Sequence, residues 1–466
     1  MIEGKQIKRN VSLTIAVQVV SFVVSLVMNL LLPKFIDEEQ YSYWQTFLLY
    51  VSYVPLLHLG LLDGIMLRYS QYDYNELDKP LVRSQFTLFL LMEILFAAIL
   101  VVISFLVENP VAQLIVLFSG IAVISTNVFT YTSYTFQLTN RISKYAKLIL
   151  LDKLVLGLGV VLLMVIGAKY FYEVCYVYFA APLVAIVWGY FHNKDLYFGK
   201  MVALNRAFGE YKENLSSGMK LLVANLSSMF MVGGAKMVVQ WRYDTLLFGQ
   251  VAFAFNVSNL FLTFVTAASV ALFPSIKRIE PEKLPDFYVK LRNSMSVILF
   301  VALLFYFPCY LLLQLWLPNY AESLVYLGIL MPIIVFSSKV TLLTNNYLKA
   351  YRKEGTMLKI NSISVLVAFA SYLICAYILD NLMLLLLCLD LVIMLRSMVS
   401  EYVVMKLIEK NFAKDFVSEF LIVAAFILCS AKLSLGMGFV GYLVVLMTYL
   451  LMNRKSCASL LKFRHH

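Results

Sequence analysis

Several ionisable side chains lie inside long apolar runs of this sequence, where a charge needs a partner, contact with water or a route to a polar surface. A charge at the centre of a bilayer costs about 2.5–3.5 kcal/mol, so each of these residues calls for a structural or a functional explanation. They are the strongest candidates for chemistry in this chain: His58, Asp63, Glu93, Lys153, Lys236, Lys339, Asp390 and Arg396.

Among the cations, Lys339 lies near the middle of its run, too far from either end to reach a polar surface easily. It is either a cation that meets an anionic ligand or one half of a buried structural pair. Lys236 lies within two turns of the end of its run, and it either lines a cavity or extends outward. Arg68 lies at the end of a run, where it could either line a cavity or act as an anchor that sets membrane topology. Lys153 and Arg396 are better explained as such anchors.

Among the acids, Glu93 lies near the middle of its run and either pairs with a cation or binds a coupling ion. Asp63 is flanked by Gly60 and Gly64, which permit close approach of another helix, and it could also cap the end of its own helix. His58 fits best a hydrogen-bonded packing histidine.

Polar uncharged residues in three of the apolar runs supply candidate hydrogen-bonding groups, although most such residues serve helix packing. They are Ser21, Ser25, Asn29, Asn225, Ser227, Ser228, Asn256, Ser258 and Asn259. The six cysteines show neither CxxC nor other metal-ligand spacing, so we expect neither a metal site nor a disulfide framework.

The elements that position these residues are about fourteen apolar runs of roughly twenty residues, the length that an α-helix needs to cross a bilayer. We therefore predict an all-α membrane protein. The predicted spans are 11–33, 43–66, 84–107, 111–136, 146–167, 170–192, 218–241, 246–274, 293–314, 322–348, 358–379, 382–404, 416–433 and 435–452.

The gaps between the runs alternate between rich and poor in Lys and Arg. One set holds about 31 Lys and Arg residues, and the opposite set holds about four: Lys34, Lys169, Arg242 and Lys432. Because loops rich in Lys and Arg stay in the cytoplasm, this alternation predicts a multi-pass protein of the inner membrane with both termini cytoplasmic.

Composition excludes several classes of protein. Hydrophobic residues make up 62% of the chain and charged residues 14%, whereas soluble domains carry about a quarter charged residues. The net charge of +11 is explained by loop anchors that meet anionic lipid headgroups, so we expect no nucleic-acid partner. No Walker A, GxSxG or HExxH motif is present, so the sequence supports neither ATP hydrolysis nor hydrolase chemistry, and we expect no cofactor.

A weak internal repeat divides the chain. The turn after the first run matches the turn after the seventh at an offset of 207 residues, which also aligns Asn29 with Lys236. Repeats are common in secondary transporters, where the substrate site lies at the repeat interface. We predict an N-lobe at 1–192 (spans 1–6), a cytoplasmic linker at 193–217, a C-lobe at 218–408 (spans 7–12), and spans 13 and 14 with a basic tail at 409–466.

Short stretches of sequence carry a resemblance to a known family. They are Lys8-Arg9-Asn10 before the first run, the turn Ile36-Asp37-Glu38-Glu39-Gln40-Tyr41-Ser42-Tyr43, Leu59-Gly60-Leu61-Leu62-Asp63-Gly64 with Arg68-Tyr69, Leu272-Phe273-Pro274-Ser275, and Asn345-Asn346-Tyr347-Leu348-Lys349-Ala350. In these stretches, and in the number and spacing of its spans, the chain resembles the oligosaccharide flippases of the polysaccharide-transporter branch of the MOP superfamily. Ser42 stands where glycine is usual in that family's turn.

The resemblance implies a MATE-like fold, with two six-helix lobes facing a central cavity and the last two spans outside. It also implies a substrate, an undecaprenyl-diphosphate-linked oligosaccharide used in O-antigen or capsule assembly. A polysaccharide polymerase and glycosyltransferases are the partner proteins it suggests. A carrier of this lipid needs cavity cations for the diphosphate and polar groups for sugar. Candidate substrate-binding residues are thus Lys339, Lys236, Arg68, Asn29 and Asn256, and candidate coupling-ion or ion-pair residues are Glu93 and Asp63.

Two alternatives stay open. A multidrug or cation antiporter of the same superfamily needs acids in its cavity, but the first span has none and the mid-membrane charges lean basic through Lys236 and Lys339. A membrane enzyme, such as a lipid-linked glycosyltransferase or polymerase, needs a large external loop with catalytic carboxylates. The longest outer gap here is about ten residues, so we expect a protein that is not an enzyme.

Overall fold

A computed structural model describes the backbone of residues 2–277 and 281–453, and their side chains outside 2–11, 223–225, 227–228 and 264–281. The side chains of Asn225, Ser227 and Ser228, and those of Lys8-Arg9-Asn10 and Leu272-Phe273-Pro274-Ser275, lie outside the described residues. So does the basic tail beyond Asn453.

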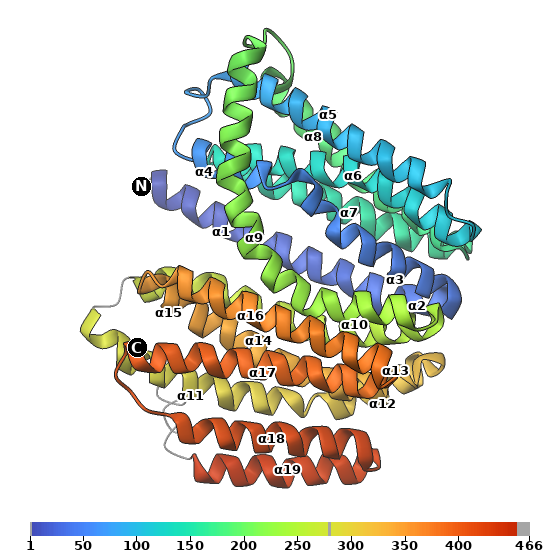
Figure 1. Ribbon diagram of the computed structural model, residues 1–466, viewed down its shortest axis with the longest axis vertical. Helices are drawn as coiled ribbons and strands as arrows, with labels where there is room; N and C mark the ends of the chain where they lie inside the picture. The colour runs from blue at the N-terminus through green and yellow to red at the C-terminus, as the bar shows by residue number, and fades with distance from the viewer. Residues whose placement is uncertain (1, 278–280, 454–466) are drawn as a thin grey trace. The chain divides into compact units, whose positions relative to one another are not determined.

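All regular elements in the described part of the chain are helices (Figure 1). Two compact units are present, Met1–Leu226 (unit 1) and Ser227–His466 (unit 2). Their common boundary falls inside one long helix, so the predicted lobe boundaries stay a prediction. Unit 1 contains α1 (Ile2–Leu26), the π-helix η1 (Val27–Leu31), α2 (Leu32–Phe35), α3 (Glu38–Tyr53), the 3₁₀-helix η2 (Val54–His58), α4 (Leu61–Tyr69), α5 (Lys79–Ser104), α6 (Pro110–Leu138), α7 (Ile142–Ile166), α8 (Phe171–Tyr197) and most of α9 (Leu204–Arg242).

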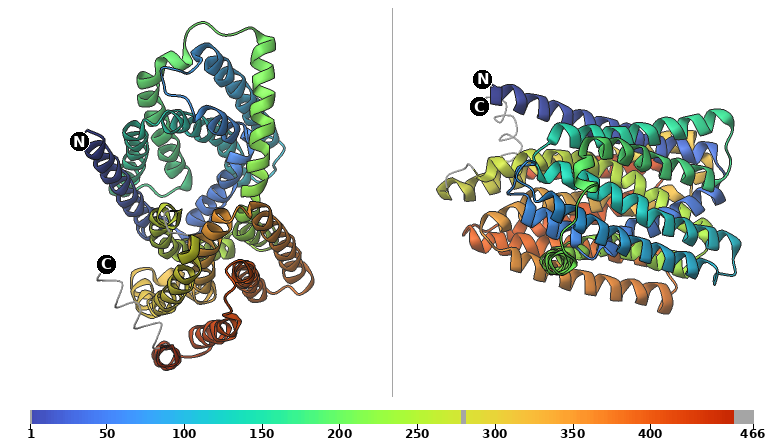
Figure 2. Two further views of the ribbon diagram at one scale, coloured as in Figure 1. Left: turned by 90° about the vertical axis from the view of Figure 1, so that its left-hand side faces the viewer. Right: turned by 90° about the horizontal axis from the view of Figure 1, so that it is seen from above.

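Unit 2 has shorter and more interrupted helices than unit 1. It contains α10 (Thr245–Lys277), η3 (Pro281–Lys283), α11 (Leu284–Leu303), α12 (Tyr306–Trp316), η4 (Pro318–Tyr320), α13 (Ser323–Leu330), α14 (Pro332–Ser338), the π-helix η5 (Lys339–Thr344), α15 (Asn345–Ala350), α16 (Glu354–Leu373), the π-helix η6 (Ile374–Ile378), α17 (Leu382–Leu407), α18 (Ala413–Lys432) and α19 (Leu435–Met452). Figures 1 and 2 show α18 and α19, the red helices, side by side, and α18 also packs against α13.

Length and hydropathy identify eleven spans in the described part of the chain, or twelve if the bent pair α3–α4 is one span. The protein is therefore a multi-pass membrane protein. The two other predicted spans lie on α9, whose side chains are described only in part, and on α18, which carries the charged residues Lys414, Asp415, Glu419 and Lys432. Helices are the expected form here because a chain in hydrocarbon must satisfy its backbone hydrogen bonds internally.

Several helices begin at residues whose side chains bind the free N–H groups of the first turn. Asn109 accepts hydrogen bonds from Val111 N and Ala112 N, both at 3.0 Å, ahead of α6. Asp78 and Asn381 cap α5 and α17 in the same way. These capping residues stand directly before apolar runs, which is why the starts of these spans can be recognised from sequence.

The second span is broken, a feature that the prediction of one span over 43–66 missed. α3 passes into the 3₁₀-helix η2 at Pro55, and the chain then bends by 53° before α4. Leu59 and Gly60 adopt left-handed conformations (φ 51° and 81°), and the Gly60 N–H donates to His58 Nδ1 at 3.1 Å. A proline and a glycine five residues apart are the local cause, since proline lacks the N–H that a continuous helix uses and glycine accepts positive φ.

The break brings α4 against α9 at backbone distance. A Cβ atom on Gly64 would lie 1.8 Å from Asn214 O, and one on Gly218 would lie 1.8 Å from Gly60 O. The prediction that Gly60 and Gly64 permit close helix approach is thus confirmed. α9 itself begins at Leu204, so the second half of the predicted linker is helical and continuous with the seventh span.

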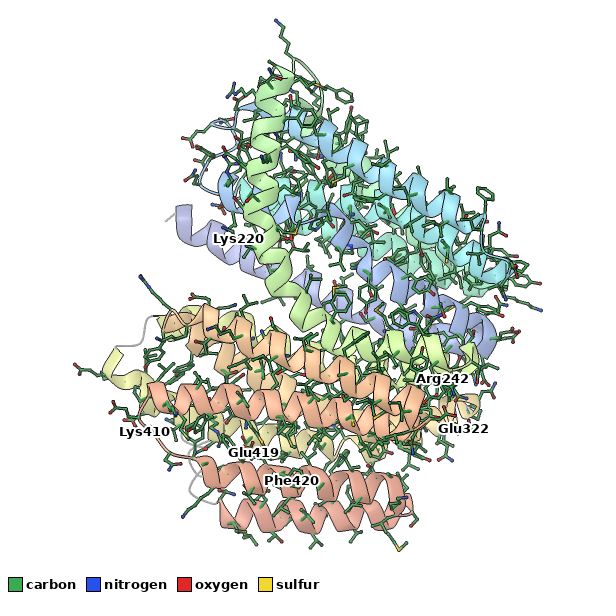
Figure 3. The ribbon with its side chains drawn as sticks, viewed as in Figure 1. Lys220, Arg242, Glu322, Lys410, Glu419 and Phe420 are labelled. Carbon is green, nitrogen blue, oxygen red and sulfur yellow. The ribbon has the colours of Figure 1, made fainter. Side chains whose placement is uncertain are left out.

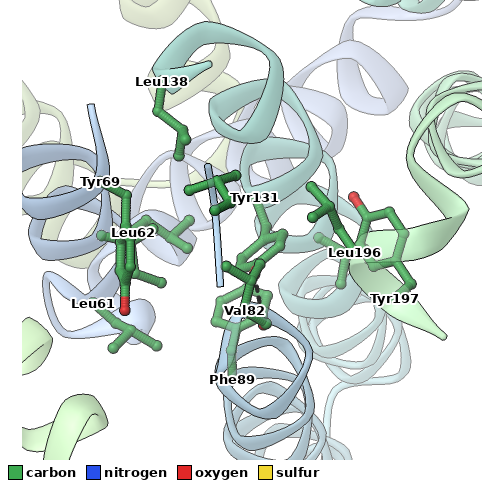
Figure 4. Packing of buried hydrophobic residues seen from close by; sticks show 12 residues of the cluster. Leu61, Leu62, Tyr69, Val82, Phe89, Tyr131, Leu138, Leu196 and Tyr197 are labelled. Atoms are coloured by element: carbon green, nitrogen blue, oxygen red, sulfur yellow. Dashed lines mark hydrogen bonds between the residues drawn. The ribbon is translucent and has the colours of Figure 1, made fainter. Parts of the chain in front are cut away.

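An apolar cluster of unit 1 joins α4, α5, α6 and α8. Phe89 and Tyr131 stack with ring centroids 5.2 Å apart, and the Tyr131 hydroxyl donates to Val82 O at 3.4 Å (Figure 4). A packed aromatic core therefore joins these helices. Tyr131 belongs to this core and is almost fully buried.

Candidate functional site: charges within the spans

Lys339 lies at the start of the π-helix η5 and is completely buried. Its ammonium lies 2.5 Å from Glu401 Oε1 of α17 and 2.7 Å from Glu419 Oε2 of α18. Of the two interpretations of Lys339, this geometry fits the one in which Lys339 is half of a buried structural pair. Figure 3 places Glu419 on α18 beside Phe420.

Arg292 of α11 completes this network. It is 1% exposed, and its three nitrogens donate to Glu401 (2.6 Å), Glu419 (2.8 Å) and Asp415 (2.8 Å). Its guanidinium also lies 4.5 Å from the centre of the Phe412 ring. Four helical elements, α11, η5, α17 and α18, are thus joined by charge-assisted hydrogen bonds, which are stronger than neutral ones.

The sequence analysis treated Arg292 as a loop residue and did not single out Glu401 or Glu419. The available signal was that both acids lie inside predicted spans, as Lys339 does. In the fully buried part of this network, which we call the α18 network (Arg292, Lys339, Glu401, Glu419), two positive and two negative charges balance. Such balance is what allows charges to stay buried, since removing one partner costs about 3–5 kcal/mol.

Two cations of unit 2 lie within spans and have no carboxylate partner among the described residues. Lys236 of α9 is partly buried and lies 5.0 Å from the centre of the Phe255 ring. Arg396 of α17 is buried, and it donates to Asn361 Oδ1 at 2.9 Å and contacts Met231 Sδ at 3.5 Å. The interpretation of Arg396 as a surface anchor was wrong, because its guanidinium is enclosed by α9 and α16.

Asp390 is a buried acid on another face of α17. Neither of its carboxyl oxygens has a hydrogen-bond partner within the described residues. It is the polar group of an otherwise apolar cavity of about 380 Å³, formed by α14, α17 and α18. The cavity lining includes Phe336, Met394, Phe420 and Leu428.

Glu93 of α5 is completely buried in unit 1 and has an amide, not a cation, as its neighbour. Asn127 of α6, also completely buried, donates from Nδ2 to Glu93 Oε2 at 2.7 Å and to Val54 O at 3.3 Å. The predicted pairing with a cation is absent among the described residues of unit 1. Val54 is the first residue of η2, so this contact lies at the break in the second span.

Arg68 and Asp63 both lie on α4. Arg68 is 29% exposed and is engaged by α9, with Nη2 2.7 Å from Glu213 and 2.9 Å from Glu210 and with Nη1 2.9 Å from Asn214 Oδ1. Asp63 is partly buried in the first turn of α4, where a carboxylate is favoured by the helix dipole. Arg68 therefore fastens α4 to α9, and its role as a substrate cation stays a prediction.

The two candidate asparagines are partly buried. Asn29 lies in the π-helix η1 and donates from Nδ2 to Ser25 O at 2.8 Å, and Asn256 lies in the middle of α10. Like Lys339, Asn29 belongs to a π-helical segment, a local form often found at functional sites. No cluster of three or more metal-ligating side chains occurs within the described residues.

Outside the spans, the loop between α4 and α5 is fastened to the ends of α7 and α8. The Tyr74 hydroxyl donates to Asp195, and the Arg141 guanidinium lies 3.6 Å from the centre of the Tyr74 ring. Burial, together with this hydrogen bond to a carboxylate, raises the pKa of Tyr74 to about 12. Tyr74 is therefore a neutral donor at physiological pH.

Solved transporters of the MOP superfamily share this fold. Lipid II flippase MurJ in an inward closed conformation matches with a TM-score of 0.61 at 13% identity, covering 95% of this chain and 98% of the flippase. A multidrug resistance MATE family transporter matches in its inward-facing conformation (TM-score 0.62, 11% identity, 88% and 95% covered). The outward-facing conformation of a MATE family transporter matches as well (0.56, 12%, 90% and 96%). No protein-family model and no curated protein matches the sequence.

The chain therefore shares the fold of these proteins over nearly its full length. The predicted fold class, an all-α membrane protein with MATE-like architecture, is confirmed. At such low identity the comparison concerns the fold, and the substrate has to be inferred from the residues of this chain.

Proposed function

We propose that the protein is a transporter that flips a polyprenyl-diphosphate-linked oligosaccharide across the bacterial inner membrane by alternating access. The observation that carries this proposal is the fold, which matches a lipid II flippase over 95% of this chain. A match to both inward-facing and outward-facing MATE transporters supports a mechanism in which access alternates. In such a mechanism, repeats move around a site near the membrane midplane.

The cations without carboxylate partners support an anionic substrate. Lys236 and Arg396 lie within spans of unit 2, and no described carboxylate neutralises either of them. A lipid diphosphate would be attracted by these charges, and the attraction is stronger where water is excluded. Asn256, also in unit 2, would add hydrogen bonds to sugar or phosphate oxygens, and the role of Asn29 in unit 1 stays a prediction.

Lys339 is not part of this proposal, because Glu401 and Glu419 already neutralise its ammonium. Arg68 is similarly engaged by Glu210 and Glu213, so we expect it to stabilise α4. The cationic character of the substrate site therefore rests on Lys236 and Arg396.

The proposal is tested with Lys236→Ala and Arg396→Ala, alone and combined, in cells that depend on this gene for surface glycan. We expect the double variant to lose most glycan export at a normal membrane level of the protein. Lys169→Ala, which removes an exposed loop cation, is the matched control and should export normally. Normal export by a well-expressed double variant would contradict the cationic site.

A second candidate is a multidrug or cation antiporter of the same fold. Glu93 and Asp390, two buried acids without cation partners among the described residues, favour it, because cavity acids bind protons, sodium or cationic drugs. Cells expressing the protein would then resist cationic dyes and export them, whereas glycan export would not depend on the protein. Purified protein in vesicles that flips a lipid-linked oligosaccharide but moves no dye would exclude the antiporter.

We also propose that both termini face the cytoplasm, from the asymmetry of Lys and Arg in the gaps. In a cysteine-free variant, single cysteines at Glu38 and Asn319 should react with an impermeant reagent applied to intact cells. A cysteine at Asn205 should stay protected until the membrane is opened. Labelling of Asn205→Cys from outside would overturn the orientation.

Association with a polysaccharide polymerase or glycosyltransferases is part of the same proposal, and co-purification after crosslinking would test it.

A further inference from the structure

One face of α17 in unit 2 carries a buried acid beside a cavity. Asp390 is 5% exposed, and neither of its carboxyl oxygens has a hydrogen-bond partner within the described residues. It lines the cavity of about 380 Å³ formed by α14, α17 and α18, whose other lining residues are apolar. Ligand pockets are typically apolar cavities of this size in which a few polar groups orient the ligand.

The neighbouring polar groups that have printed contacts are engaged elsewhere. Arg396, six residues further along α17, lies on another face of the helix and donates to Asn361. Lys339 is held in the α18 network. The hydroxyl of Tyr372 donates to a backbone carbonyl of α9 at 3.1 Å. A buried carboxylate without a partner is costly, so the two free oxygens of Asp390 indicate a donor that comes from outside the described residues.

The cavity reaches a surface of unit 2 that faces lipid. Four of its lining residues are exposed, Leu387 and Leu391 on α17 and Phe420 and Leu428 on α18. α17 is long and apolar enough to cross a membrane, and apolar side chains exposed on such a helix contact lipid chains. A ligand of this cavity therefore enters from the bilayer, which selects molecules that partition into lipid.

The carboxylate defines the polar end of that ligand. One carboxylate matches one positive charge, and its two free oxygens need N–H donors, which a protonated primary amine has and a quaternary ammonium lacks. A metal ion does not fit, because a hard cation needs about six oxygen ligands and the rest of the lining is apolar. The rings of Phe336 and Phe420 suit an apolar body next to a cationic head.

We propose that this cavity binds a protonated alkylamine, a molecule with one N–H-bearing cationic head and one apolar chain. The head donates hydrogen bonds to both oxygens of Asp390, and the chain lies among the apolar residues of α14, α17 and α18. The site is separate from the substrate cations proposed above, since Arg396 lies on another face of α17. Phe420 directly follows Glu419 of the α18 network (Figure 3), so the occupant braces α18 against α14 and α17. Binding does not rest on the proposed function.

The test compares three probes that share one chain and differ in the head. Purified protein in detergent is heated at neutral pH with decylamine, decyltrimethylammonium or decan-1-ol at equal concentration. We expect decylamine to raise the Tm by several degrees in a concentration-dependent way, as for any ligand that binds the folded state, and the other two to leave it unchanged. Asp390→Asn removes the charge and Ala424→Phe fills the cavity, so both should abolish the shift. Glu93→Gln, a matched change of a buried acid in unit 1, should keep it.

A Tm that does not respond to decylamine, or a shift that survives in Asp390→Asn, would overturn the site. Equal shifts with decan-1-ol would indicate a pocket for a lipid chain only, and equal shifts with decyltrimethylammonium would indicate an unspecific effect of charge, and either result overturns the proposal. Without amine, Asp390→Asn should have a Tm at or above that of the wild type, because it removes a buried charge that has no partner. A lower Tm would reveal a structural partner of Asp390 and would count against the site.

A second measurement covers the case in which Ala424→Phe folds poorly. The wild type is crosslinked with a decylamine that carries a diazirine at the end of its chain, and the labelled peptides are identified by mass spectrometry. Labels on α14, α17 and α18 that decylamine competes away and decan-1-ol does not would support the cavity. Labels spread over many lipid-facing helices, or insensitive to decylamine, would refute it.

Discussion

Buried carboxylates are treated in two different ways by the two units. In unit 2, Glu401 and Glu419 lie between Arg292 and Lys339, and the α18 network carries no net charge. In unit 1, Glu93 is just as buried but has Asn127 as its neighbour and no described cation. Paired buried charges hold helices together, whereas a buried charge without an opposite charge is suited to reversible binding of a ligand. Burial of a charge therefore does not by itself indicate function. The partner of the charge distinguishes a structural role from a functional one.

The largest effect should follow from breaking the α18 network at its centre. Arg292→Met leaves Glu401, Glu419 and Asp415 without their shared cation, and we expect the free energy of unfolding to fall by about 5 kcal/mol, the upper end for a broken buried pair. The protein level in membranes and the Tm after purification measure this. Lys410→Met, which removes an exposed partner of Asp286, is the control and should have little effect. A normal Tm for Arg292→Met would refute a structural role of the network.

Removal of Lys339 should cost somewhat less, about 3–5 kcal/mol, because Arg292 still contacts both buried acids. The double variant Lys339→Met, Glu419→Gln restores charge balance, so it should recover part of the lost stability. A double-mutant cycle on Tm and unfolding free energy measures the coupling. If Lys339→Met instead folds normally and loses glycan export, the ammonium contacts substrate and the structural interpretation fails.

Glu93→Gln tests whether the buried acid of unit 1 has a structural partner, as the acids of the α18 network do. Because no described cation is left unpaired, we expect the free energy of unfolding to stay within about 1 kcal/mol of the wild type, in contrast to the loss at the α18 network. Chemical unfolding of the purified protein would measure it. A loss near 4 kcal/mol would mean that Glu93 has a structural partner and that the two units do not differ in this respect.

The smallest effect should come from Arg68→Ala. This guanidinium is 29% exposed, and partly exposed ion pairs contribute about 0.2–1 kcal/mol. We expect a loss of about 1 kcal/mol and glycan export close to normal. Export that is abolished at normal protein level would restore Arg68 as a substrate cation.

The break in the second span shows how local signals and distant contacts differ in what they reveal. Pro55 and Gly60 are visible in the sequence, and with hindsight they mark where helical hydrogen bonding must change. That the carbonyl of Val54 then meets Asn127, 73 residues away, is not a local property. The flanking Gly60 and Gly64 carried a more specific signal, since two small residues beside an acid permit another helix to approach closely.

Properties that depend on neighbours along the chain can be predicted from the sequence of this protein. Apolar runs of the right length become helices in a bilayer whatever they contact, so the all-α membrane fold and the position of the spans could be predicted. Tertiary structure alone decided the partners of the buried charges. Lys339 meets Glu419 across 80 residues and Arg292 meets Glu401 across 109, and apolar periodicity carries no information on such pairs. For that reason Lys339, prominent as a lone mid-span cation in the sequence, is neutralised in the fold, whereas the described hydrogen-bond partner of Glu93 is the amide of Asn127.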